Sequence, residues 1–236
     1  MIPTYNELEN SERLCRSILN LKISNTDILF IDDSSPDGTG KLLDKISKKN
    51  KKVNVLHRAA KKGIGSAHLD GIYWAYKHRY EELITMDCDF THSPSSIQKI
   101  IDADKIYDVV VGSRYLQKKS LVGWNVYRKA LTMVGHIVTK MLLGMNYDAS
   151  GAFRLYRLNR IPGEIFGLVT SKSYSFFPES LYILNSNGLK IGEIPVKLPP
   201  RTYGHSKMKL KDIFLSVKLI LSLYIKSVIN RNDLKI

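Results

Sequence analysis

Two acidic residues follow a short apolar run near the middle of the chain. Asp87 and Asp89 flank Cys88 directly after residues 83–86, whose apolar character predicts a β-strand. In extended backbone, residues two apart point to the same side, so both carboxylates can face one site. Two hard oxygen ligands suit Mg²⁺ or Mn²⁺. The triplet alone is weak support for a metal site, because most such acids are solvated or cap helices.

A second acidic pair, Asp32 and Asp33, follows the apolar run 28–31 and leads into the turn sequence Ser-Pro-Asp-Gly at 35–38. A turn explains that sequence but does not require two adjacent acids, so one of them could accept hydrogen bonds from a base or ribose. Residues 61–67, Lys-Lys-Gly-Ile-Gly-Ser-Ala, resemble a phosphate-cradling loop ahead of a helix. Their spacing matches neither a P-loop nor a dinucleotide fingerprint, which disfavours ATPase and NAD-dependent functions.

The chain is strongly basic, with 36 Lys and Arg against 22 Asp and Glu and a net charge of +14. This excess indicates an anionic partner, which could be nucleic acid, a phospholipid surface or a phosphorylated substrate. Arginine binds phosphate bidentately, so Arg114, Arg128 and Arg201 are candidates to hold a phosphate at a lipid surface, although singly each is more often a surface charge. No recognition helix, zinc-finger spacing or aromatic RNA-binding pattern supports nucleic acid.

Two further titratable residues have an ordinary and a functional explanation. Glu179 lies among apolar residues, where a buried, paired carboxylate is the ordinary explanation and a raised pKa or a sugar contact the functional one. His92 is close to the acidic triplet, but a lone histidine is more often a hydrogen-bonded structural residue than a ligand.

The elements that position these residues can be read from the hydrophobic pattern. Short apolar runs at 28–31, 52–56, 83–86 and 108–112 alternate with helical segments at 10–21, 40–49, 65–79 and 94–103. This order predicts an α/β fold, a mostly parallel sheet flanked by helices. Ligands of such sheets bind beyond the carboxyl ends of the strands. The residues expected to converge there are Asp32, Asp33, Asp87, Asp89 and Arg114.

Length and composition are those of an ordinary globular protein. The 236 residues, 44% of them hydrophobic, predict one large or two small domains with a packed core. Cys15 and Cys88 are far apart and lack a CxxC partner, which argues against zinc and a disulfide framework and favours a reducing compartment. No run reaches the 18 apolar residues of a membrane span, and the first residues do not form a signal sequence, so the protein is expected to be neither exported nor integral.

Two amphipathic segments occupy the second half of the chain. Residues 123–145 predict a helix with a wide apolar face, and residues 213–229 predict a more apolar one. The second would be about 25 Å long, short of the roughly 30 Å hydrocarbon core, and it contains two lysines. A helix lying in the headgroup region and a core helix explain it equally well. The expected organisation is a domain over 1–211 and a membrane-interface segment over 212–236.

Five segments together resemble the inverting glycosyltransferases with the GT-A fold. They are Ile-Pro-Thr-Tyr-Asn-Glu at 2–7, Ile-Asp-Asp-Ser-Ser-Pro-Asp-Gly-Thr at 31–39, Met-Asp-Cys-Asp at 86–89, Val-Gly-Ser-Arg at 111–114 and Ser-Gly-Ala-Phe-Arg-Leu at 150–155. Four more narrow the resemblance to dolichyl- or polyprenyl-phosphate mannosyltransferases, over residues 2 to about 211. These are Arg-Lys at 128–129, Phe-Pro-Glu at 177–179, Glu-Ile-Pro at 193–195 and residues 201–207.

The resemblance implies metal-dependent transfer of a hexose, mannose from GDP-mannose, to a polyprenyl or dolichyl phosphate with inversion of the anomeric centre. A lipid monophosphate is largely ionised at pH 7, so its attack needs no strong protein base. It also implies a peripheral protein on the cytoplasmic face of an anionic membrane. A UDP-hexose donor such as UDP-glucose is the alternative within the enzyme class. A non-catalytic basic module that binds membranes or nucleic acid is the alternative outside it.

The resemblance also assigns roles to residues. Those matching nucleotide-binding positions are Pro3, Tyr5, Glu7 and Asp33, and those lining the sugar side are Ser150, Gly151 and Glu179. The metal pair is Asp87 and Asp89, the former also a donor-binding residue. The catalytic set, which stabilises the departing diphosphate and the phosphates of donor and acceptor, is Asp89, Arg114, Arg128, Arg201 and Lys207.

This sequence departs from the family pattern in two places. The family usually has several apolar residues before the Pro-Thr-Tyr-Asn-Glu element, whereas only Met1 and Ile2 precede it here. We therefore expect a short first strand, either because the start codon is placed too late or because the sequence is a fragment. Thr91 stands where relatives often carry a longer polar residue, which leaves the third protein ligand of the metal open. No membrane-spanning extension follows Ile236 in this sequence, so we expect the protein to resemble the forms that lie on membranes.

Overall fold

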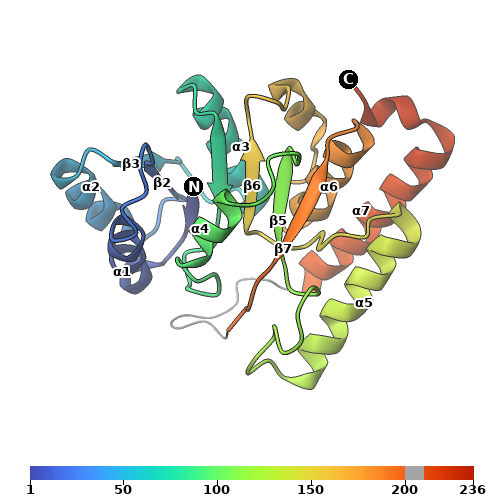
Figure 1. Ribbon diagram of the computed structural model, residues 1–236, viewed down its shortest axis with the longest axis horizontal. Coiled ribbons are helices and arrows are strands. Elements are labelled where there is room, and N and C mark those ends of the chain that lie inside the picture. The colour runs from blue at the N-terminus through green and yellow to red at the C-terminus, as the bar shows by residue number, and fades with distance from the viewer. Residues whose placement is uncertain (200–209) are drawn as a thin grey trace.

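The computed structural model describes residues 1–199 and 210–236, so the predicted site residues Arg201 and Lys207 lie outside the described part. Strands and helices alternate along the chain (Figure 1). In order they are β1 (Ile2–Thr4), α1 (Leu8–Leu19), β2 (Ile28–Asp32), α2 (Thr39–Lys49), β3 (Val53–His57), α3 (Ile64–Lys77), β4 (Glu82–Thr85), α4 (Ser96–Ile101), β5 (Val109–Ser113), α5 (Val126–Leu143), β6 (Arg154–Arg157), η1 (Gly163–Leu168), α6 (Phe176–Ser186), β7 (Ile191–Pro195), α7 (Leu210–Ile229) and η2 (Arg231–Leu234).

The strands form two sheets that meet at the first residue. Strands β1, β2 and β3 pair in parallel, and the second sheet has the order β4-β6-β5-β7. The amide of Met86 donates to the carbonyl of Met1 at 3.2 Å, and the Met1 ammonium donates to the carbonyl of Ile84 at 2.7 Å. Strand β6 runs antiparallel to both β4 and β5, whereas β5 and β7 are parallel. The predicted α/β fold with a mostly parallel sheet is confirmed.

Helices cover both faces of these sheets. Consecutive residues of β2 alternate between the faces, with Phe30 in one buried apolar cluster and Ile31 in the other. Helices α1, α2 and α4 contribute to the cluster that contains Phe30. Helices α3, α6 and α7, with η1, contribute to the cluster that contains Ile31. Ligand-binding residues are therefore left to the strand ends, because the faces are occupied by packing.

All four predicted strands and the helices between them are present, with shifts of one or two residues at most ends. The first strand has only three residues, which confirms the short β1. The prediction that α4 starts at Pro94 is wrong: the amide of Ser96 donates to Ser93 and that of Ile97 to Pro94, so these residues form a turn and the helix begins at Ser96. The hydrophobic pattern did not reveal β6, α6 or β7.

The two amphipathic segments form neighbouring helices. Helices α5 and α7 lie side by side at one end of the molecule (Figure 1). Ile220 and Leu223 of α7 are buried in the core, whereas Phe214 and Ile225 are more than half exposed. Helix α7 therefore has a core face, as the core explanation expects, and an exposed apolar face, for which the membrane-interface explanation stays a prediction. Within the described residues, every helix falls short of the length and hydrophobicity needed to cross a bilayer.

Candidate active site

The carboxyl ends of β2 and β3 carry an acid–arginine network. Asp33 follows β2, and its carboxylate accepts a hydrogen bond from the guanidinium of Arg58, which follows β3. Arg58 also donates to Asp70 at 2.8 Å and to the hydroxyl of Ser66, both on α3. Arg58 and Asp33 are almost fully buried, so each depends on the other for its charge to be tolerated.

Asp33 is held between opposing electrostatic effects. Burial raises the pKa of its carboxyl, and the neighbouring Asp32 adds to this, while Arg58 and Lys61 lower it. The net pKa is above the ordinary value of an aspartate. The Asp33 carboxylate is fixed by Arg58 and follows β2 at the edge where ligands of such sheets bind. It can therefore accept hydrogen bonds from a ribose or a base.

The predicted nucleotide residues of the first loop lie beside this network. The ammonium of Lys61 sits 3.8 Å from the centre of the Tyr5 ring, a cation–π contact that joins the loops after β1 and β3. Pro3 is buried within β1. Glu7 precedes α1, where its backbone amide donates to the Thr39 hydroxyl at 3.0 Å and its carboxylate accepts from the Asn10 amide at 2.7 Å.

The loop 61–67 is shaped by packing against another segment rather than by an open phosphate cradle. A Cβ on Gly63 would lie 2.2 Å from the carbonyl oxygen of Lys172, and one on Gly65 would lie 2.6 Å from the Cβ of Phe176. The amide of Ser66, at the start of α3, already donates to the Lys172 carbonyl at 3.2 Å. Because this backbone is in contact with residues 171–173, the resemblance to a phosphate loop is better explained by close backbone approach.

The predicted metal pair follows β4. Asp89 is buried, and its Oδ1 accepts hydrogen bonds from the amide of Thr91 at 3.0 Å and from its hydroxyl at 2.6 Å. Thr91 thus orients Asp89. The Asp87 side chain is about one third exposed and its Oδ2 lies 3.9 Å from Nδ1 of His92.

His92 is a buried neighbour of this pair. Its ring stacks on Phe153, with centroids 5.4 Å apart, and its Nδ1 has no hydrogen-bond partner within the described part of the chain. Burial lowers the pKa of His92 to about 4, although Asp89 opposes the shift, so the imidazole is neutral near pH 7. It is not a charge partner for the two acids at that pH.

The carboxylates of Asp87 and Asp89 could bind a divalent cation if further ligands completed its coordination. Two carboxylates supply hard oxygen donors for Mg²⁺ or Mn²⁺. Among residues 1–199 and 210–236, no group of three or more His, Cys, Asp or Glu side chains is arranged to hold a metal. A cation bound by Asp87 and Asp89 could take further oxygen ligands from a bound substrate or from water, as Mg²⁺ commonly does.

An ion pair at the end of β5 is the most buried charge interaction of the site. Arg114 donates to Asp148 through Nε at 2.7 Å and through Nη2 at 3.1 Å, a bidentate arrangement. Its Nη2 also reaches the Ser150 hydroxyl at 3.2 Å. The backbone amide of Asp148 donates to Glu193 of β7 at 2.6 Å. Arg114 is therefore a held, almost buried group and not a surface charge.

The ion pair also connects to the metal pair. Burial lowers the pKa of Arg114, but Asp148, Tyr115 and Asp87 outweigh it and leave the pKa raised. The contribution of Asp87 places Arg114 within electrostatic reach of the predicted metal ligands. Strands β4 and β5 both flank β6, so their carboxyl ends face the same edge. The structure thus places Asp87, Asp89 and Arg114 at the same edge of the sheet.

The remaining predicted residues lie in different surroundings. Ser150 and Gly151 form the turn before β6, next to Arg114. Glu179, in the first turn of α6, accepts hydrogen bonds from the amide and hydroxyl of Thr170 and from the amide of Ser171. Glu179 is thus a buried carboxylate that is hydrogen-bonded within the protein, as its ordinary explanation expects. Its contact with the sugar stays a prediction. Arg128, exposed in the first turn of α5, stacks 3.6 Å above the Trp124 ring.

Four residues of the site were missed from the sequence. Arg58 follows a predicted strand, and Asp148 directly precedes the Ser-Gly-Ala-Phe-Arg segment, so position alone could have suggested both. Glu193 was part of a recognised segment, but its contact with the Asp148 amide links strands that are distant in sequence. Asp70 carries no signal of its own, because it resembles any exposed acid on a helix.

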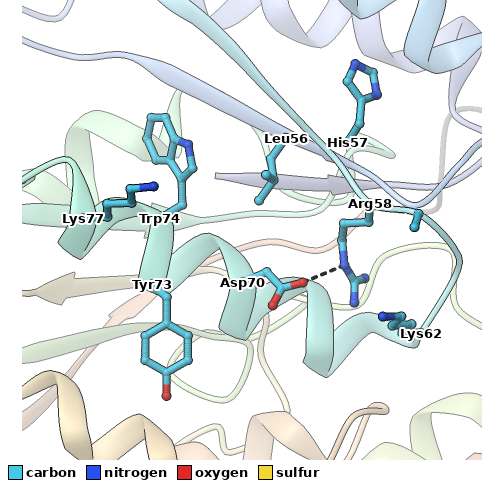
Figure 2. A pocket seen from close by; sticks show the side chains of 9 residues that line it. Leu56, His57, Arg58, Lys62, Asp70, Tyr73, Trp74 and Lys77 are labelled. Atoms are coloured by element: carbon cyan, nitrogen blue, oxygen red, sulfur yellow. Dashed lines mark hydrogen bonds and ion pairs between the residues drawn. The ribbon is translucent and has the colours of Figure 1, made fainter.

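A hollow of about 410 Å³ is lined by Arg58 and Asp70 of the acid–arginine network (Figure 2). Its wall includes Tyr73, Trp74 and Lys77 of α3. None of the residues predicted to bind the donor lines it. It is therefore distinct from the edge where Asp87, Asp89 and Arg114 meet.

The buried pair between Arg114 and Asp148 should contribute to the stability of the folded protein. Asp148→Ala leaves the Arg114 guanidinium buried without its carboxylate, so we expect a loss of about 3–5 kcal/mol in the free energy of unfolding. Glu12→Ala is the matched control, because it removes a carboxylate from an exposed arginine pair with Arg16 and should cost less than about 1 kcal/mol. Urea denaturation measures both, and equal losses would contradict the assignment of Asp148.

Comparison with known proteins agrees with this geometry. The model of the family described as Glycosyl transferase family 2 matches residues 1–161. The chain is 34% identical over 209 residues to a protein named undecaprenyl-phosphate mannosyltransferase from Micrococcus luteus, covering 88% of this chain and 86% of that protein. It is 33% identical over 216 residues to a protein named polyprenol monophosphomannose synthase from Mycolicibacterium smegmatis, covering 90% and 81%.

Among solved structures, the fold is similar to that of glucosyl-3-phosphoglycerate synthase from Mycobacterium tuberculosis in complex with Mn²⁺, uridine-diphosphate and phosphoglyceric acid. The TM-score is 0.62 at 16% identity, covering 96% of this chain and 76% of that one. This likeness shows the fold alone. With the family model and the two relatives, it leads to one assignment: the chain is a glycosyltransferase and belongs to glycosyl transferase family 2.

Proposed function

We propose that this enzyme transfers mannose from GDP-mannose to a polyprenyl phosphate, with inversion of the anomeric centre. The observation that carries the proposal is the meeting of Asp87 and Asp89 with Arg114 at one sheet edge, since it combines ligands for a cation with a fixed cation for phosphate. The names of the two curated relatives support mannose as the sugar and a polyprenyl phosphate as the acceptor.

The reaction needs positioning and charge neutralisation more than proton transfer. The acceptor phosphate is an oxyanion at neutral pH and attacks the anomeric carbon directly, so no strong protein base is required. Attack opposite to the departing diphosphate inverts the anomeric centre. Asp33 and Tyr5 are proposed to hold the nucleotide, while Ser150 and Gly151 face the sugar.

Arginine and metal ligands reduce the repulsion between two anionic partners. Arg114 is oriented by Asp148 before substrates arrive, so little reorganisation is needed when charge develops on the leaving group. Asp87 and Asp89 are proposed to hold Mg²⁺ or Mn²⁺, which would supply Lewis-acid stabilisation of the diphosphate. Arg128, Arg201 and Lys207 remain proposed phosphate-contacting residues.

An exposed apolar surface next to the site is proposed to bind the membrane that carries the acceptor. It consists of exposed side chains on α5 and α7, among them Val126, Tyr127, Met141, Phe214, Leu221, Ile225 and Val228. Exposed lysines on the same helices, Lys129, Lys140, Lys218 and Lys226, would reach anionic headgroups. We propose that this surface lies in the headgroup region of the cytoplasmic leaflet.

The donor assignment is tested by binding and by product analysis. With Mg²⁺ present, calorimetry should give GDP-mannose an affinity at least about tenfold above that of UDP-glucose. A polyprenyl phosphate incubated with a panel of nucleotide sugars should yield the mannosyl lipid phosphate. A clear preference for a uridine donor would overturn the mannose assignment and leave the enzyme class intact.

The metal pair is tested by Asp89→Ala. This change removes one of two proposed ligands, so we expect transfer to be lost and membrane attachment to persist, because attachment depends on other residues. Asp104→Ala, which removes an exposed acid in the turn before β5, is the control and should retain transfer. Product formation by the Asp89 variant at the wild-type rate would contradict a metal-binding role of Asp89.

A non-catalytic basic binding module would give a different result. Its binding to membranes or nucleic acid would weaken steeply as the salt concentration rises, and Asp89→Ala would leave that binding unchanged.

The membrane surface is tested by charge on the exposed face of α7. Phe214→Glu combined with Ile225→Glu should abolish co-sedimentation with vesicles containing phosphatidylglycerol, because two carboxylates would enter the headgroup region. The core residues Ile220 and Leu223 are left intact, so folding should be kept. Ile106→Glu, at an exposed apolar residue outside these helices, is the control. Undiminished sedimentation of the double variant would show that another surface binds.

A further inference from the structure

Among the described residues, Arg154 is the largest fully buried side chain, and it lies at the ligand edge of the sheet. It is the first residue of β6, paired with Thr85 of β4 and Val111 of β5. Because β6 runs antiparallel to these strands, its beginning lies where they end. Asp87 follows Thr85 by two residues and Arg114 follows Val111 by three. Arg154 therefore sits between the proposed metal ligands and the proposed phosphate-binding arginine.

The Arg154 guanidinium uses all five of its N–H donors on neutral oxygens. Nε donates to the Gly151 carbonyl at 2.8 Å, and Nη2 donates to the Ala149 carbonyl at 2.8 Å and the Phe177 carbonyl at 2.9 Å. Nη1 donates to the hydroxyls of Ser180 at 3.1 Å and Tyr156 at 3.3 Å. The five partners match the five donors of an arginine, a number that lysine cannot supply.

These bonds fix the turn that holds Arg114. The carbonyls of Ala149 and Gly151 lie on either side of Ser150, whose hydroxyl accepts from Arg114, and Asp148 directly precedes them. Two further bonds tie the following residues to the neighbouring strands: the Thr85 hydroxyl donates to the Ala152 carbonyl at 2.6 Å, and the Gly112 amide donates to the Phe153 carbonyl at 2.9 Å. The turn is thus fixed relative to both β4 and β5.

A structural role alone does not explain the choice of residue. Burying a guanidinium is costly, and the five hydrogen-bond partners of Arg154 are all neutral, so they supply no opposite charge to offset it. We propose that Arg154 is a positioning residue for sugar transfer, which fixes residues 148–151 so that Asp148 and Ser150 hold the Arg114 guanidinium beside the reacting phosphates. This inference rests on the proposed function, in which Arg114 contacts those phosphates.

The test compares two identical substitutions in one strand. Arg154→Lys keeps the charge but loses the directed donors, so the turn should move and kcat should fall about 100-fold, with a smaller change in the KM for GDP-mannose. Arg157→Lys is the matched control: Arg157 is also buried in β6 and donates to Glu82 and to the carbonyls of Tyr107 and Ala103, at the strand end away from the site. It should lose stability but keep kcat. Equal kcat losses in both variants, or none in Arg154→Lys, would overturn the positioning role.

A second measurement needs no substrate. Hydrogen exchange of the amides in residues 148–153 should quicken in Arg154→Lys and not in Arg157→Lys. Unchanged exchange in Arg154→Lys would contradict the claim that Arg154 fixes this turn. If the wild-type enzyme forms no mannosyl lipid while exchange quickens in Arg154→Lys, the proposed function is wrong but Arg154 still fixes the turn. If the wild type is active and Arg154→Lys keeps its kcat, the inference alone fails.

A second variant covers the case in which Arg154→Lys does not fold. Gly151→Ala leaves the guanidinium untouched but places a methyl group 3.3 Å from the Gly112 carbonyl oxygen and 3.6 Å from that of Asp148, so the same turn must shift by a few tenths of an ångström. We expect about a tenfold lower kcat with little change in melting temperature. Wild-type kcat in this variant would contradict the dependence of transfer on the turn.

Discussion

The bidentate pair between Arg114 and Asp148 is the interaction on which the site depends. Both side chains are almost inaccessible to water, so neither charge would be tolerated without the other. The pair is supported from two sides, by the Ser150 hydroxyl and by Glu193, which accepts the backbone amide of Asp148. Burial raises the pKa of the Glu193 carboxyl, so this side chain becomes protonated at a higher pH than an ordinary glutamate. The orientation of one arginine thus depends on groups from β5, the turn before β6, and β7.

The antiparallel strand β6 makes this arrangement possible. In a purely parallel sheet every strand would deliver its carboxyl end to the ligand edge, whereas β6 delivers its beginning there. A turn that enters β6 can therefore lie between the residues after β4 and those after β5. Arg154 occupies that position and is bound to the turn it follows. Five hydrogen bonds satisfy its donors, but they supply no opposite charge, so burying the guanidinium remains costly.

The sequence predicted the parts of the site that depend on strand ends, and missed those that depend on distant contacts. Asp33, Asp87 and Arg114 each follow an apolar run, and each does lie just after the carboxyl end of a strand, where ligands of α/β sheets bind. Asp148 and Arg58 acquire their roles only through partners that lie 34 and 25 residues away. The glycines of loop 61–67 were assigned to phosphate because the backbone of 171–173, which they actually contact, has no sequence signal. The predicted start of α4 at Pro94 is wrong because the backbone of a turn and that of a first helical turn are similar, and residues 93–96 form a turn.

Tyr115 connects the site to the surface proposed to bind the membrane. It directly follows Arg114, its ring stacks 3.9 Å from that of His136, and its hydroxyl donates to the Thr132 carbonyl, both on α5. An acceptor whose lipid chain stays in the bilayer can present its phosphate only near the membrane surface, so the arginine that meets it must be held at a fixed distance from that surface. The contact of Tyr115 with α5 supplies such a constraint, because a displacement of α5 would move the backbone next to Arg114. The position of the ion pair is therefore coupled to that of α5, which carries part of the surface proposed to bind the membrane.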